Sequence, residues 1–239
     1  MMIIGQLVCG PGEADRYLEE TLKEFKRLCD TAVVCFCNAG PAEKALVYQY
    51  GYENYQDNRE WGHHQPDIKT DLLKRILTLE PDWIMPLDAD ETLPTIKDRA
   101  ALEALTENRV ACQMYVVNLW NNPGRYRKSL GFWNVRFYKP GASPDTQFLR
   151  KPLHCGNAPP FFYNQPAKEC YVPHILLHKG LMAPDSRARK ADRYRTYDPD
   201  ARHKGRMYYD ALEDGADGSE YSEADVVAKI TEFCEKIGV

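Results

Sequence analysis

Three carboxylates stand within four residues, directly after a short apolar run. Residues 83–87 have the length and composition of a buried strand, and Asp88, Asp90 and Glu91 follow it at once. Acids at the carboxyl end of a strand in an open α/β sheet lie at the edge where such sheets bind ligands. Two aspartates one residue apart offer oxygen ligands to a hard divalent cation, which can in turn bind phosphates. The spacing therefore favours a cation site.

The same acids also fit a simpler interpretation. They would form a solvated turn, or they would cap the helix expected at residues 96–105, because acidic side chains favour helix N-termini. The apolar strand in front of them favours the metal site over the turn.

The elements before this motif predict parallel βαβ units. Apolar strands are expected at residues 3–9 and 32–37, each followed by a loop, at 10–12 and 38–41. Amphipathic spacing predicts helices at residues 14–28, 42–50 and 67–79, with a polar connection at 52–66. Because strands and helices alternate, the strand ends and their loops should meet at one sheet edge.

The second half predicts a more mixed sheet. Strands are expected at residues 110–120 and 131–138, joined by a turn at 121–124, and a last strand at 171–178 follows a long loop at 141–166. A strongly basic stretch spans 179–206, and helical spacing returns at 222–237. We expect one domain at 1–200 and a helical extension at 201–239, packed on that domain or on a partner. An oligomer is compatible with this.

Composition and charge argue against several classes of protein. The chain of 239 residues has a net charge of -4, which gives no electrostatic reason to expect nucleic acid. No apolar run approaches a transmembrane length, and the N-terminus lacks a signal-peptide pattern. The eight cysteines form no C-x-x-C pair and suit buried reduced thiols better than zinc ligands or disulfides. We therefore expect a soluble, cytoplasmic protein.

The order of these motifs resembles family 2 glycosyltransferases of the GT-A fold. The similarity covers residues 3–200 and is most specific at Leu-Asp-Ala-Asp-Glu, residues 87–91. It implies a Rossmann-like mixed central sheet flanked by helices. It also implies a Mn²⁺- or Mg²⁺-dependent enzyme that transfers a sugar, with inversion, from a nucleoside diphosphate donor to a saccharide or other hydroxyl acceptor.

The resemblance also assigns metal and donor residues. Asp88, Asp90 and His178 would bind the metal, with His174 as the alternative; a half-buried structural histidine is the other interpretation. Relatives read the nucleobase with an aspartate where this chain has Cys37 or Asn38, so the base is left open. The residues expected to contact the donor are Cys9, Gly10, Glu13, Cys37, Asn38, Lys69, Asp71, Asp88, Ala89, Arg187 and Lys190.

Catalysis and acceptor binding depend on fewer residues. An inverting transfer needs a base for the acceptor hydroxyl, and where relatives carry a His-Glu pair this chain has His154 alone, with Asp145 and Asp185 as alternatives. Glu91 is either a second catalytic carboxylate or a residue that orients its loop. Trp133 and Arg136 stand where relatives place acceptor contacts, unless they belong to a packed sheet face.

Two rival functions follow from the departures. A non-catalytic sugar- or nucleotide-binding protein on a decayed GT-A fold would explain the missing glutamate and the cysteine at the nucleobase position. A nucleotidyltransferase would share the α/β half and the metal, but the first loop, Gly10-Pro11-Gly12-Glu13, lacks the basic residues that it would need.

Overall fold

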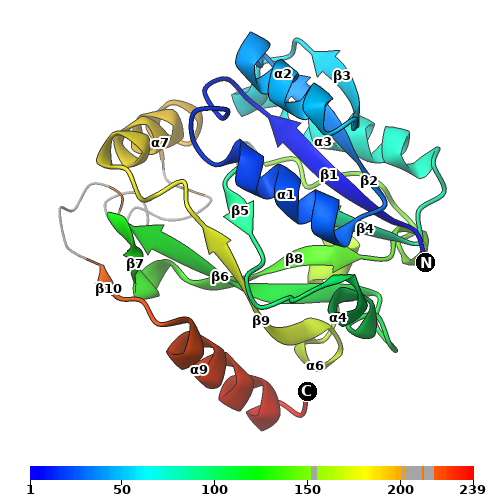
Figure 1. Cartoon of the computed structure of the whole chain (residues 1–239), viewed down its shortest axis with the longest axis vertical. Coiled ribbons are helices and arrows are strands. Elements are labelled where there is room, and N and C mark those ends of the chain that lie inside the picture. Colours follow the sequence, from blue (N-terminus) through cyan, green and yellow to red (C-terminus); the bar gives the residue numbers. More distant parts are fainter. Residues whose placement is uncertain (152–154, 201, 203–211, 213–217) are drawn as a thin grey trace.

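The computed structural model describes residues 1–151, 155–200, 202, 212 and 218–239, and arranges them around one mixed β-sheet (Figure 1). Its main strand order is β10-β7-β6-β8-β4-β1-β2-β3, and β9 joins β6 to β5. The predicted α/β fold with a mixed central sheet is confirmed. The parallel part comprises β1 (Ile3–Cys9), β2 (Thr31–Cys37), β3 (Glu53–Asp57) and β4 (Trp83–Pro86).

Helices cover both faces of the parallel strands. Side chains of β1 and β2 alternate between two hydrophobic clusters, as the two-residue period of a strand requires. The first cluster includes Leu22 and Phe25 of α1, and the second includes Ile68 and Leu72 of α3. These helices and the one between them are α1 (Leu18–Leu28), α2 (Pro41–Gln49) and α3 (Trp61–Leu77).

The second half of the sheet is organised by its longest strand, β6. This strand pairs antiparallel with β7 and β8 and parallel with β9, which places Asn118 beside His178. On its other side, β9 pairs antiparallel with β5, which places His178 beside Glu91. The strands are β5 (Glu91–Thr92), β6 (Ala111–Trp120), β7 (Asn122–Tyr126), β8 (Phe132–Tyr138), β9 (Tyr171–His178) and β10 (Ser219–Glu220).

The remaining helices border the sheet. The C-terminal helix α9 (Glu223–Lys236) packs against β9 and lies apart from the helices of the parallel half (Figure 1). Within the expected extension, residues 201, 203–211 and 213–217 lie outside the described part. The other helices are α4 (Arg99–Ala104), η1 (Lys128–Leu130), η2 (Pro140–Ala142), α5 (Pro160–Tyr163), α6 (Ala167–Cys170) and α7 (Pro184–Tyr197).

Several elements differ from the sequence-based expectation. Helix α3 begins at Trp61 rather than at 67, because Pro66 is tolerated inside it although proline removes a backbone donor. Strand β3 occupies part of the predicted polar connection, β7 occupies part of the predicted turn, and α5 lies within the predicted long loop. The predicted helix at 96–105 is shorter, and the Asp98 side chain caps it by accepting from Ala101 N at 2.8 Å.

All eight cysteines are free thiols. Within the described residues, no helix is both long and apolar enough to span a membrane.

Candidate active site

The acidic turn after β4 is held by its own hydrogen bonds. The backbone N of Asp88 donates to Glu91 Oε2 at 2.9 Å, and the backbone N of Glu91 donates back to Asp88 O at 3.1 Å. The Thr21 hydroxyl of α1 donates to Glu91 O at 3.0 Å. These hydrogen bonds therefore fix the conformation of the turn that carries Asp88 and Asp90.

Glu91 and Arg136 form a buried ion pair beneath this turn. Arg136 Nε donates to Glu91 Oε2 at 2.9 Å and Nη2 donates to Oε1 at 2.5 Å, in the bidentate geometry that suits guanidinium and carboxylate groups. Only 1% of Glu91 and 2% of Arg136 is exposed. Because both oxygens of Glu91 are engaged, the structure favours the interpretation that Glu91 orients the loop. The sequence predicts an acceptor contact for Arg136; in the structure its guanidinium group binds Glu91.

Asp90 faces His178 across the β5–β9 pair. Asp90 Oδ2 lies 3.3 Å from His178 Nε2, and the backbone N of Lys179 donates to Asp90 O at 2.9 Å. Burial raises the pKa of Asp90, but the charges of His178 and Lys190 outweigh burial and hold the pKa well below its usual range. The carboxylate is therefore ionised across the physiological pH range.

Asn118 sets the orientation of the His178 ring. The Asn118 amide donates from Nδ2 to Leu130 O at 2.6 Å, which turns its Oδ1 toward His178 Nδ1 at 2.7 Å. An amide oxygen only accepts, so Nδ1 of His178 carries the hydrogen and Nε2 faces Asp90. Nε2 is therefore the ring nitrogen beside the Asp90 carboxylate, and a cation that took the place of the proton between them would find one nitrogen and one oxygen ligand side by side.

Gly180 leaves the space that this pair occupies. A Cβ atom at Gly180 would lie 2.0 Å from Asp90 Oδ2 and 3.3 Å from His178 Nε2. A larger residue would displace the carboxylate. Asp90 and His178 are the two side chains here that could hold a divalent cation, and Asp88 lies two residues before Asp90 in the turn. A ready-made group of three or more His, Cys, Asp or Glu ligands is absent from the described part of the chain.

Lys69 acts on Asp88 through Asn157. Lys69 Nζ donates to Gly156 O at 2.8 Å and to Asn157 Oδ1, and Asn157 Nδ2 donates to Asp88 Oδ2 at 3.2 Å. Burial raises the pKa of Asp88, whereas Lys69 and Arg136 lower it more, so the pKa stands below its usual value. This network connects α3, the segment before α5 and the acidic turn.

These groups border one cleft of about 820 Å³, which is within the range of small-molecule sites. The cleft is formed by the ends of β1, β2 and β4, by the first part of α3 and by α7. The predicted site residues that line it are Gly10, Glu13, Cys37, Asn38, Lys69, Asp88, Ala89, Asp90, Glu91, Trp133, Arg136, His178 and Lys190.

Three predicted donor residues lie outside the cleft lining. Cys9 is fully buried behind it. Asp71 is on the outer part of α3 and pairs with Arg59 at 2.8 Å, because the helix turns it away from Lys69. Arg187 is buried against Trp120, 4.2 Å from the ring centroid, and donates to the carbonyls of residues 181 and 182. The predicted base, His154, lies outside the described residues.

Trp133 lies at the edge of the cleft with its ring engaged on the α9 side. The ring stacks on Tyr171 at 4.3 Å and on Phe233 at 5.8 Å between centroids. This matches the packed sheet face that the sequence left open as an alternative.

Several cleft residues were not predicted from the sequence. Gln65 is 8% exposed, and its Oε1 has no hydrogen-bond partner among the described residues. Trp61 and Gln65 were missed because α3 begins before Pro66. Asn38, which the sequence did predict, adopts a φ of 55°, a left-handed conformation that asparagine tolerates better than most residues. Other cleft residues that the sequence did not single out are Arg16, Asn157, Tyr163 and Tyr197.

Glu13 is the carboxylate of the first loop that faces the cleft. Burial, and then the charge of Asp90, raise its pKa to about 7, against the opposing effect of Arg16 and Arg193. Its protonation is therefore sensitive to any charge that enters the cleft.

The sheet order, the helices on both faces and a ligand cleft at the acidic turn define a GT-A fold, the fold of nucleotide-diphospho-sugar transferases. The crystal structure of TarS from S. aureus is similar to this chain with a TM-score of 0.50 and 10% sequence identity, over 87% of this chain and 45% of TarS. The chain thus spans less than half of that structure. At this identity the likeness shows the fold alone.

Two further solved structures are similar at lower TM-scores. TarS 1-349 gives 0.49 with 10% identity, over 89% of this chain and 69% of that one. A putative nucleotide-diphospho-sugar transferase from Desulfovibrio desulfuricans G20 gives 0.43 with 10% identity, over 89% of this chain and 97% of that one. No protein-family model matches the chain, and no curated protein matches it in sequence.

Proposed function

We propose that this chain is a metal-dependent glycosyltransferase that moves a sugar from a nucleoside diphosphate donor to a hydroxyl group of a saccharide or similar acceptor. The observation that supports this most is the pairing of Asp90 with His178 over Gly180, in the same cleft as Asp88 and the basic residues of α7. The GT-A fold is consistent with it.

The metal would be Mn²⁺ or Mg²⁺, bound by Asp90 and His178 with Asp88 as the third group. When bound there, such a cation would neutralise the charge that develops on the departing nucleoside diphosphate. Asn118 would keep the His178 ring in the ligating tautomer. The rigid turn would keep Asp88 and Asp90 in place, so little reorganisation would be needed when the donor binds.

The diphosphate would lie against α7. Lys190 and Arg193 line the cleft on this helix, and Arg16 lines it on the loop before α1. Guanidinium and ammonium groups suit phosphate oxygens. Lys190 also lowers the pKa of Asp90, which indicates that its charge acts at the proposed metal site.

The nucleoside would lie between the end of β2 and the beginning of α3. Asn38, Trp61 and Gln65 line this part of the cleft. A purine or pyrimidine can stack on an aromatic ring, which Trp61 supplies here. The aspartate that reads the nucleobase in family 2 glycosyltransferases is replaced here by Cys37 or Asn38, so the proposal does not specify the nucleobase.

The acceptor would approach from the β8 side of the turn. The Tyr163 hydroxyl donates to Asn134 Oδ1 at 2.7 Å and accepts from the backbone N of Asn157 at 2.8 Å, next to Asp88. In this proposal, Asn134 and Tyr163 would position the acceptor hydroxyl. The transfer with inversion and the role of His154 as base stay predictions from the sequence.

A second candidate is a nucleotide-sugar-binding protein without turnover. The complete engagement of Glu91 by Arg136 favours it, because this removes one of the three carboxylates of the acidic turn from proton transfer.

The test is an activity panel with its own control variants. The protein would be incubated with nucleotide sugars and MnCl₂, and released nucleoside diphosphate would be measured with saccharide acceptors present. Asp90→Asn should abolish release, whereas Asp71→Asn, an acid on α3 outside the cleft, should leave it unchanged.

The outcomes separate the candidates. Donor binding without release would support the binding protein. Pyrophosphate formation from a nucleoside triphosphate and a sugar phosphate would identify a nucleotidyltransferase. If no nucleotide sugar binds or reacts in the presence of manganese, the proposal is wrong.

A further inference from the structure

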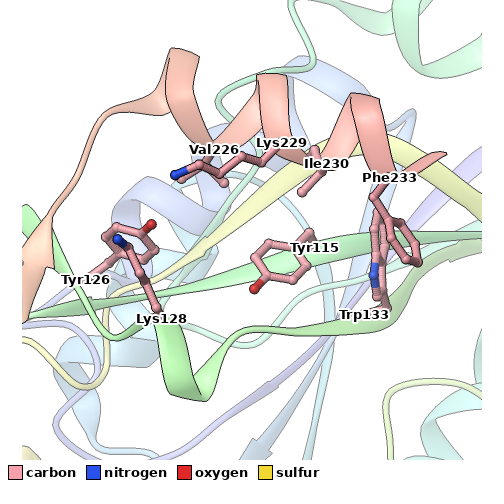
Figure 2. Close-up of a pocket in the computed structure, with 8 residues that line it drawn as sticks. All are labelled: Tyr115, Tyr126, Lys128, Trp133, Val226, Lys229, Ile230 and Phe233. Carbon is pink, nitrogen blue, oxygen red and sulfur yellow. The ribbon is translucent and has the colours of Figure 1, made fainter. Parts of the chain in front are cut away.

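A second pocket lies under the C-terminal helix, on the sheet face that α9 covers. We call it the α9 pocket; it has a volume of about 350 Å³, near the lower end of small-molecule sites. Figure 2 shows Tyr115 of β6, Tyr126 of β7 and Trp133 of β8 facing α9 across it. Of the described residues, Trp133 alone lines both this pocket and the cleft.

The body of the α9 pocket is apolar. From α9, Val226 and Ile230 contribute buried side chains of the same hydrophobic cluster as Tyr126. Phe233 closes one end and stacks on Trp133, yet 41% of it is exposed. An exposed aromatic ring beside an apolar pocket gains from a ligand that covers it, since burial of apolar surface is favourable.

The opposite end of the α9 pocket is cationic. Figure 2 shows the ammonium groups of Lys128 and Lys229 near Tyr126, away from Trp133 and Phe233. Lys128 Nζ lies 5.9 Å from the Tyr126 ring centroid. Neither lysine is in an ion pair with another described residue, whereas Lys236 on the same helix pairs with a glutamate one turn away.

The acids of α9 form no ion pair with Lys128 or Lys229 among the described residues, although the charge of Asp225 contributes, after burial, to the raised pKa of Tyr126. Glu223 and Asp225 belong to the first turn of the helix, and neither lines the pocket. Asp225 stands four residues before Lys229 without pairing with it. The charge at the pocket mouth is therefore available to a ligand.

We propose that the α9 pocket binds a small single-chain amphipathic anion. Its apolar part would lie along Ile230, with its end against the stacked rings of Trp133 and Phe233, and its carboxylate or phosphate would lie between Lys128 and Lys229. The inference rests on the division of the pocket into an apolar end and a cationic end. It does not depend on the proposed transferase activity.

The experiment is a calorimetric titration with two probes below their micelle concentrations. Decanoate and decyltrimethylammonium carry the same apolar chain with opposite head-group charge. The intact protein should bind decanoate at one site, on the order of tenfold more tightly than the cationic probe.

Variants at the two ends separate the contributions. The double variant Lys128→Ser and Lys229→Ser changes exposed residues only, and it should remove the preference for decanoate. Ile230→Trp should fill the pocket and abolish binding of both probes. Lys236→Ser, on the same helix outside the pocket, should bind like the intact protein.

Three outcomes would overturn the proposal. One is equal affinity of the intact protein for the two probes, and another is a double lysine variant that still prefers decanoate. The third is binding to anionic phosphatidylglycerol vesicles with no binding of decanoate, which would identify α9 as a membrane-surface contact instead. Circular dichroism of each variant verifies that the fold is retained.

Discussion

Replacing Gly180 with alanine should displace the Asp90 carboxylate while Asp90 and His178 themselves are not substituted. The added Cβ would lie 2.0 Å from Asp90 Oδ2, and real Cβ contacts are at least 3.0 Å. The carboxylate oxygen would have to move by about 1 Å. Gly180 does not adopt the left-handed backbone region, so alanine causes no backbone strain there.

A displacement of this size is large for a metal site. Ligand distances in such sites vary by only about 0.2 Å, so the Asp90 oxygen would leave the position that a cation needs. Disturbing a group that supports a metal ligand typically reduces affinity by about 10- to 100-fold, which is about 1.4–2.8 kcal/mol. We expect a loss of Mn²⁺ affinity in this range.

The assay is a Mn²⁺ titration followed by electron paramagnetic resonance of the free ion. Gly141→Ala is the control, because its Cβ would meet nothing within 4 Å. Both substitutions also restrict the unfolded chain, which stabilises proteins by about 0.4–1 kcal/mol where the native backbone allows it. Equal Mn²⁺ affinity of Gly180→Ala and Gly141→Ala, in folded proteins, would refute the assigned site.

Three other predictions concern charged groups of the cleft. The pKa of Glu13 is raised from 4.5 to about 7, so the folded state keeps a proton that the unfolded chain has released. The free energy of unfolding should therefore fall, by up to about 3 kcal/mol, as the pH rises through this window. Urea titrations at a series of pH values should show that the free energy of unfolding of Glu13→Gln depends less on pH than that of the intact protein. The same pH dependence in both proteins would contradict the assignment. Glu91→Gln should lower the free energy of unfolding by about 3–5 kcal/mol, because the buried Arg136 loses its bidentate partner and keeps only Asp88, at 3.8 Å. A loss below about 1 kcal/mol in urea would argue against a structural pair. His178→Ala should weaken Mn²⁺ binding on the order of tenfold or more, and an unchanged constant would remove it as a ligand.

The strands that carry local apolar patterns could be predicted from the sequence. Strand β1 has the predicted bounds, and β2, β4 and β9 lie within one residue of theirs, because each is a short apolar run bounded by polar or turn residues. The acidic turn was predictable for the same reason. Strand β3 was not, since Glu-Asn-Tyr-Gln-Asp has no apolar period and depends on pairing with β2.

The site residues divide in a similar way. Asp90 and His178 each lie at or just after the end of a strand that the sequence predicts, so the predicted strands already place both residues at the sheet edge. The contacts that define their roles join residues far apart in the sequence. Lys69 and Asn157 are 88 residues apart, and no local pattern predicts that they meet. The same applies to Arg187, whose position in a basic stretch predicts a phosphate contact while its surroundings bury it against Trp120.

The most direct test of the central claim is a thermal-shift panel of UDP, GDP, CDP, ADP and dTDP, each with and without manganese, on the intact protein and on Asp90→Asn. A ligand that binds the native state raises the melting temperature by mass action. The account predicts a rise for one nucleotide that requires manganese and disappears in Asp90→Asn. A rise that persists without manganese or in the variant, or no rise with any nucleotide, would contradict it.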